Sequence, residues 1–265
     1  MWLVLALLPA NAVWGQAPVY SAASLVDGGD YAPAPFAPNS IVSLFGSGLA
    51  RSSQGLTADV ILNNTLPVEL NGTRVYVSDY QAPLLYVSNG QINFLVPGNQ
   101  VLGDVKIRVV REGFTGPEIA VTLVDGAPAL FQPAAGYAIA AHLDNSPIAP
   151  GAPAQAGETI VVYACGLGRT QPNPAPGAIP QNAAVIQRLS DLKVYLGGTA
   201  IDAASSRYAG LTPGSAGLYQ INLVLPDNPG TDPEIRVAIA DQSSPAGLKL
   251  AVQGGGAQLS AARMR

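Results

Sequence analysis

The side chains that most often carry out catalysis are scarce in this sequence, which has one histidine and one cysteine. His142 stands at the end of an expected strand, and as a catalytic base it would need a nucleophile and an orienting acid. The sequence holds no Gly-x-Ser-x-Gly turn that would present a serine. We therefore predict a surface or turn histidine. Cys165 precedes a glycine turn and takes the place that Ser47 has in the first half, so we predict a small buried residue there.

The densest group of oxygen ligands lies near the C-terminus, at Asp227, Asn228, Asp232 and Glu234. Calcium prefers such ligands, and Asp232 and Glu234 are spaced like two carboxylates on one face of a strand, where they could act as acid and base. Two prolines interrupt the group, and its spacing is not that of an EF-hand loop. The pattern therefore favours a structural loop over a metal site or an acid–base pair.

Two short glycine motifs, Gly46-x-Gly48 and Gly166-x-Gly168, contain only the first part of a dinucleotide-binding fingerprint. The third glycine and the helix that should follow are missing, so we predict turns. From these residues we predict no catalytic residue, no cofactor and no metal. The chain is then not an enzyme, and the remaining alternative is the accessory domain of a secreted hydrolase.

Tyrosines are the candidate ligand-binding side chains, because sugar-binding surfaces present exposed aromatic rings. Both tryptophans, Trp2 and Trp14, lie in an N-terminal segment that we expect to be removed. If several tyrosines share one exposed face, a carbohydrate-binding or hydrolase-accessory domain is favoured. If they are buried, a non-catalytic module for adhesion, scaffolding or protein interaction is favoured, and this is our main prediction. The candidates are Tyr80, Tyr86, Tyr208 and Tyr219.

Composition favours a folded β protein that does not bind nucleic acid. Hydrophobic residues make up 48% of the 265 residues and charged residues only 11%, a balance that excludes a disordered chain. The 29 glycines and 23 prolines predict many turns, as in an all-β fold. The net charge is −4, and lysines and arginines are not clustered. Because phosphates are neutralised by clustered basic side chains, we predict no nucleic-acid partner.

Residues 1–15 have the pattern of a signal peptide. An apolar run from Trp2 to Leu8 is followed by small and turn-forming residues, and cleavage is expected between Gly15 and Gln16. The run is shorter than a transmembrane helix requires, so we expect no membrane span after signal removal. The alternative is a first buried strand. The predicted location is secreted, extracellular or at the cell surface, with the periplasm as an alternative, and the predicted partner is a protein or a surface glycan.

One seven-residue pattern occurs twice, at Gln91–Pro97 and Gln220–Pro226. Apolar residues alternate with other residues in both copies, which predicts a strand with one buried face. Ile92 and Phe94 in the first copy, and Ile221 and Leu223 in the second, should therefore lie in the cores. The asparagines between them, Asn93 and Asn222, should bond to local backbone or reach across the sheet.

Further segments repeat in the same order roughly 120 residues apart, which predicts two copies of one domain rather than a solenoid. Thr159–Ala164 matches Ile41–Gly46, and Lys193–Leu196 matches Arg74–Val77. We predict one domain over residues 16–126, a second over 127–253 with the hinge near Ala127, and a loose tail over 254–265.

The stretch from Ala37 to Ala50 resembles the opening of the Solibacter uncharacterised C-terminal domain family of secreted acidobacterial proteins. Each half also resembles, more weakly, immunoglobulin-like domains of the IPT/TIG type. The family has no established reaction or ligand, so the resemblance implies two tandem immunoglobulin-like β-sandwiches and export, not an activity. Further matches are Ala82–Ser88, Gln91–Phe94, Ala127–Phe131, Gly157–Ile160, Cys165–Gly168, Tyr208–Gly214 and Gly217–Gln220.

Overall fold

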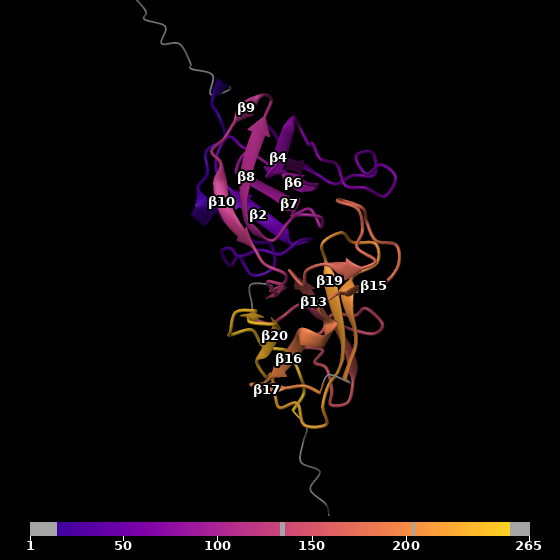
Figure 1. The fold of residues 1–265 in the computed structure, drawn as a ribbon. Helices are drawn as coiled ribbons and strands as arrows, with labels where there is room; N and C mark the ends of the chain where they lie inside the picture. Colours follow the sequence, from indigo (N-terminus) through magenta and orange to yellow (C-terminus); the bar gives the residue numbers. More distant parts are fainter. Residues whose placement is uncertain (1–14, 133–135, 203–204, 255–265) are drawn as a thin grey trace, which may run out of the picture.

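The computed structural model describes residues 15–132, 136–202 and 205–254 (Figure 1). It is nearly all-β, and every pairing between its named strands is antiparallel. Two short 3₁₀ helices, η2 (Ala22–Ser24) and η3 (Leu189–Asp191), are the helices of the described residues. In the same residues, no helix has the length and apolar character needed to cross a membrane. The predicted all-β fold class is confirmed. The predicted signal peptide and tail fall almost wholly outside the described ranges.

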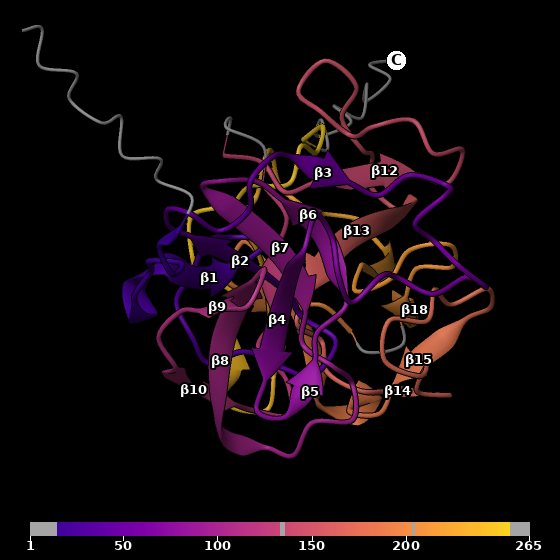
Figure 2. The same cartoon turned by 90° about the horizontal axis from the view of Figure 1, so that it is seen from above.

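The first half of the chain forms two sheets that pack face to face (Figure 2). Val42 and Phe94 from one sheet and Val75 and Ile107 from the other belong to one buried cluster, which makes the pair a sandwich. The first sheet has the order β1 (Leu25–Asp27), β2 (Ile41–Phe45), β7 (Gln91–Leu95), β6 (Leu84–Val87), β3 (Gln54–Gly55). The second has the order β10 (Ile119–Leu123), β8 (Gly103–Arg111), β4 (Thr73–Val77), β5 (Tyr80–Gln81), and β9 (Phe114–Thr115) also pairs with β8.

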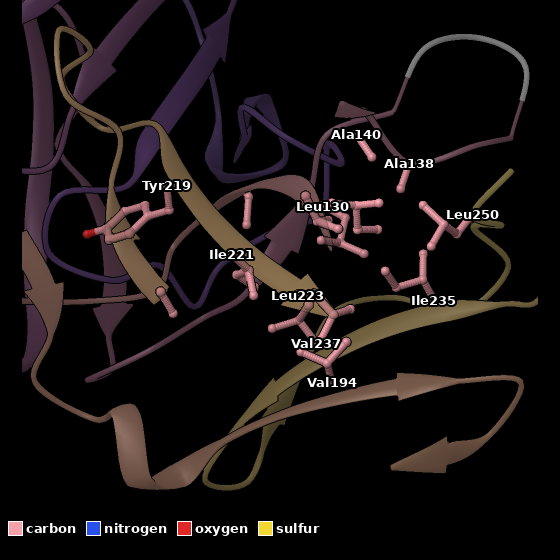
Figure 3. Close-up of a cluster of buried hydrophobic side chains, with 14 of the residues drawn as sticks. Leu130, Ala138, Ala140, Val194, Tyr219, Ile221, Leu223, Ile235, Val237 and Leu250 are labelled. Carbon is pink, nitrogen blue, oxygen red and sulfur yellow. The ribbon is translucent and has the colours of Figure 1, made fainter. Parts of the chain in front are cut away.

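The second half repeats this plan with a larger first sheet. Its core holds Ile221 and Leu223 from one sheet and Val194 and Val237 from the other (Figure 3). The first sheet has the order β11 (Ala129–Leu130), β13 (Thr159–Cys165), β19 (Tyr219–Val224), β18 (Ser206–Leu211), β15 (Ala184–Ile186), β14 (Thr170–Gln171), and β12 (Ala140–His142) pairs with β13. The second has the order β17 (Thr199–Ala200), β16 (Leu192–Leu196), β20 (Ile235–Ile239), β21 (Gln242–Ser243).

The two copies of the repeated pattern are β7 and β19, which lie inside the first sheet of each half. Ile92, Phe94, Ile221 and Leu223 are all buried, so the predicted strand phase is confirmed. Asn93 Oδ1 accepts hydrogen bonds from Gln91 Nε2 at 2.9 Å and, across the sheet, from Ser43 Oγ at 3.0 Å. The same Gln–Asn bond recurs in β19. The repeated polar residues therefore satisfy one another on the sheet surface.

Polar contacts join the two halves, whose strands gather at opposite ends of Figure 1. The backbone N–H of Ile41 donates to Cys165 Sγ at 3.1 Å. Arg169 Nε donates to the carbonyl of Gly98 at 3.0 Å, and Arg188 pairs with Asp125 at 2.9 Å. Each half keeps its own core, and the predicted boundary near residue 127 lies between the two cores. Whether the halves fold as separate domains stays a prediction.

Candidate functional site

His142 lies at the end of β12, and its two ring nitrogens contact two other segments of the chain. Its Nδ1 lies against Glu158 Oε1, and its Nε2 lies 3.4 Å from the carbonyl oxygen of Ala152. The hydrogen bond to Glu158 raises the pKa of the imidazole above its usual value. Since both ring nitrogens already face an acceptor, neither is left to take a proton from a substrate.

Cys165 is a fully buried residue, as predicted. Its sulfur accepts a hydrogen bond from Ile41, and burial raises the pKa of the thiol well above its ordinary value. The turn that follows needs glycine, because Gly166 has φ +72° and a Cβ there would overlap the carbonyl of Ala127. The thiol is therefore an inert contact between the halves.

The acidic residues of the C-terminal loop bind parts of their own chain. Asp232 accepts hydrogen bonds from the Tyr137 hydroxyl at 3.0 Å and from the backbone N–H of Val252 at 3.2 Å. Glu234 accepts one from the backbone N–H of Gly247 at 2.9 Å. In the part of the chain that the structure describes, no three His, Cys, Asp or Glu residues lie close enough to hold a metal ion.

The four candidate tyrosines do not lie together on one exposed face. For Tyr219 and Tyr208 this corrects the prediction of a ligand-binding side chain. Tyr219 is fully buried, because it has the same alternation phase as Ile221, and its hydroxyl bonds to the carbonyl of Gly168. Tyr208 uses its hydroxyl on the backbone, accepting from Ala184 N–H at 3.1 Å and donating to the Leu211 carbonyl at 2.7 Å. Tyr80 in β5 is 53% exposed and Tyr86 in β6 is half-buried, and they belong to different sheets.

An aromatic groove lies instead on the outer face of the second half's smaller sheet. Val194 and Val237 point into the core (Figure 3), so their neighbours Tyr195 and Arg236 lie on the opposite face. Tyr195 and Arg236 are register partners across β16 and β20. The groove has a volume of about 440 Å³, within the range of roughly 300–1,000 Å³ that small-molecule sites occupy.

Polar groups of both hydrogen-bonding kinds line this groove around the ring. Arg236 and the amide of Gln242 are donors, Glu234 and Asp241 are acceptors, and hydroxyl and amide groups serve as both. One glycine and two alanines at the remaining positions leave room above the sheet. The lining residues are Tyr195, Gly198, Glu234, Arg236, Ala238, Ala240, Asp241, Gln242 and Ser243.

The conformation of Arg236 is set by the neighbouring strand. Its Nη2 donates to Ser243 Oγ at 2.9 Å, and its Nε donates to the carbonyl of Ser244 at 3.1 Å. The corresponding pair in the first half is arranged differently, because the Arg108 guanidinium lies 4.7 Å from the centre of the Tyr76 ring and covers it. The same cross-strand pair therefore forms a covered ring in one half and lines a groove in the other.

The sequence alone did not single out Tyr195 or Arg236. Tyr195 was matched to Tyr76 as part of a repeated strand, but the two groove residues are 41 positions apart and meet only through the pairing of β16 with β20. The available signal was the alternation in Leu192–Leu196, which places Tyr195 on the face away from the core.

Comparisons with known proteins give distant structural likeness only. No protein-family model matches the chain, and no curated protein matches it. A surface glycan-binding protein from Prevotella bryantii is 13% identical over 88% of this chain and 42% of its own length, with a TM-score of 0.28. A Bacteroides ovatus glucan-utilisation protein solved with a mixed-linkage heptasaccharide is 11% identical over 82% and 42%, with a TM-score of 0.32. A γ-CGTase from Bacillus clarkii is 15% identical over 92% and 27%, with a TM-score of 0.30.

This chain spans less than half the length of each of these three proteins. The likeness is too distant to transfer an activity or a ligand. Membership of the Solibacter family stays a prediction.

Proposed function

We propose that this chain is a non-catalytic binding module whose ligand is a neutral carbohydrate bound in the Tyr195 groove. The observation that supports this most directly is one aromatic ring placed among mixed donors and acceptors on an outer sheet face. Sugars have apolar CH faces that pack on aromatic rings and hydroxyls that both donate and accept. A groove with this lining therefore complements a sugar at both its faces and its edges.

The charges of the groove favour a neutral ligand over an anionic one. One guanidinium, that of Arg236, stands beside two carboxylates, those of Glu234 and Asp241. A phosphate or a polyanion would be repelled by the two carboxylates, which no cluster of basic residues offsets. The hydroxyl groups of a neutral sugar carry no charge, so the carboxylates do not repel them. They can form hydrogen bonds with both the guanidinium and the carboxylates.

The wider prediction of an exported module at the cell surface is consistent with this function, because such a module has access to extracellular polysaccharides. Adhesion or scaffolding through a protein partner is the competing proposal. A protein partner would need a wide contact surface, whereas the groove holds a single ring and has the size of a small-molecule site.

The test is retardation of the purified chain in native gels that contain soluble β-glucan, xylan or starch, followed by calorimetry on any polysaccharide that retards it. We expect retardation by at least one neutral polysaccharide, with no release of reducing ends during the run. Migration that no polysaccharide changes would contradict the carbohydrate proposal. Release of reducing ends would contradict the non-catalytic part of it.

A further inference from the structure

A buried arginine in the first half has no counter-ion in the described residues. Arg111 ends strand β8 and is only 4% exposed. Glu112, its neighbour in sequence, instead accepts a hydrogen bond from Arg51 Nε at 2.6 Å. No carboxylate among the described residues forms an ion pair with Arg111. A buried cation of this kind is costly unless it is paired and fully hydrogen-bonded.

The guanidinium of Arg111 is also short of hydrogen-bond acceptors. Its Nη1 donates to the carbonyl of Gly48 at 2.5 Å, and its Nη2 donates to the carbonyl of Gln16 at 2.6 Å. Nε is buried and has no partner in the described part of the chain. Because a guanidinium has five N–H groups, most of its donors remain unused by the protein.

The fold itself does not require a charge at this position. Arg111 pairs with Thr73 in β8–β4, and the same register position in the second half, opposite Leu192, is Ile239. Ile239 is buried in its core. The second half thus builds an equivalent strand with an apolar residue, so the strand pairing alone does not require an arginine.

Arg111 lines a cavity of about 210 Å³ at the end of the first sandwich. Ser47, Asn89 and a second arginine, Arg51, contribute polar groups to its wall. Ala17, Val19 and Ala50 contribute apolar ones. Gly48 permits the approach of the guanidinium, since a Cβ there would lie 3.2 Å from Arg111 Nη1. Of the two arginines at the cavity, Arg51 pairs with Glu112, whereas Arg111 forms no ion pair in the described residues, and an apolar flank lies beside them.

We propose that this cavity is a binding site for a small organic carboxylate, whose COO⁻ group pairs with Arg111. A planar carboxylate matches the fork of a guanidinium, and its single negative charge matches the single unpaired cation. A doubly charged phosphate or sulfate carries two negative charges, but only Arg111 is without an ion pair, since Arg51 is already paired with Glu112. The carbon chain of the ligand would lie against Ala17, Val19 and Ala50. This site is separate from the Tyr195 groove and does not depend on it.

The test is the thermal midpoint of the full chain in sodium propionate, compared with propionamide plus sodium chloride at equal ionic strength. Binding to the folded state alone raises the midpoint with ligand concentration, by a few degrees at tenfold excess over Kd. We expect propionate to raise the midpoint and to saturate, and propionamide with salt to leave it unchanged. Equal effects of the two, or a propionate effect that rises with concentration without saturating, would overturn the proposal.

Two variants show whether any shift comes from this cavity. In Arg111→Ile the first half takes the residue of the second, so the variant should fold, and the response to propionate should disappear. In Ser47→Asp the exposed Ser47 is replaced by a carboxylate at the cavity wall, which should raise the midpoint and remove the response. A Ser47→Asp variant that still responds like the parent would place propionate elsewhere and overturn the proposal.

Discussion

Tyr195 and Arg236 stand opposite each other on strands β16 and β20, as Tyr76 and Arg108 do on β4 and β8. In the first half the guanidinium covers the ring at 4.7 Å, whereas Arg236 bonds to Ser243 and Ser244 beside a groove. One duplicated pair has therefore taken two arrangements, and the second leaves the Tyr195 ring at the wall of a groove. We therefore expect ligand binding by this pair in the second half and a structural role for it in the first.

Phe94→Ala should be among the most damaging substitutions in the first half. Phe94 is fully buried in β7, between its partners Val42 and Leu84 on the neighbouring strands. Removing the ring leaves a cavity, and the expected loss is about 3–5 kcal/mol of the free energy of unfolding. Denaturant unfolding of the variant beside the parent measures it. An unchanged midpoint would mean that the ring contributes little to the core.

Asp27 should make the protein less stable as the pH rises from 4 to 7. Burial raises the pKa of this carboxyl from 3.8 to about 7, while in the unfolded chain it ionises near its ordinary value. Between those values the unfolded chain has lost the proton that the folded chain keeps. Stability therefore falls by up to about 4 kcal/mol across this window and is constant above it.

The check is the pH dependence of the unfolding free energy in Asp27→Asn, which cannot ionise. Its curve should be flatter than the parent's between pH 4 and 7. Asp59 is the control, because it is exposed and a hydrogen bond from Thr57 lowers the pKa of its carboxyl. Asp59→Asn should leave the slope above about pH 5 unchanged. If Asp27→Asn keeps the parent's slope, Asp27 is ionised in the folded protein.

Arg169→Ala should weaken the contact between the two halves. Arg169 donates to the backbone carbonyls of Gly98 and Gln100. The substitution leaves the Gln100 carbonyl without this donor, while the Gly98 carbonyl keeps a hydrogen bond from Asn173 Nδ2 at 3.3 Å. The expected loss is about 1–3 kcal/mol. Two separate transitions in denaturant should then replace a single one if the halves are independent domains.

Arg207→Ala is the matched control, since Arg207 is an exposed arginine on β18. It should leave the unfolding curve unchanged. An Arg169→Ala curve identical to the parent's would show that this contact does not couple the halves.

The alternation of the repeated strands made much of the fold predictable. Ile92 and Phe94 could be assigned to the core because every second residue is apolar, and Tyr219 shares that phase with Ile221. The burial of Tyr219 could therefore have been predicted from the same pattern, although its aromatic side chain suggested a ligand-binding face. Arg111 shows the reverse case, since its phase follows Val109 into the core while its charge suggests the surface.

Contacts between distant strands could not be predicted in the same way. The pairing of Glu158 with His142 depends on how a loop returns to the end of β12. The groove depends on β20 pairing with β16 in the register that brings Arg236 to Tyr195. A single sequence gives the face of each residue but not the partner strand, so the groove became visible only in the folded chain.

The most direct measurement is the affinity of Tyr195→Ala for the neutral polysaccharide that retards the parent, with Tyr80→Ala as the control. Both are tyrosines outside the core, and only Tyr195 lines the groove. Stacking of an aromatic ring on a ligand contributes enough that we expect at least a tenfold weaker Kd for Tyr195→Ala, a loss of about 1.4 kcal/mol. Tyr80→Ala should bind like the parent. Unchanged binding by Tyr195→Ala, or loss of binding in Tyr80→Ala alone, would contradict the account.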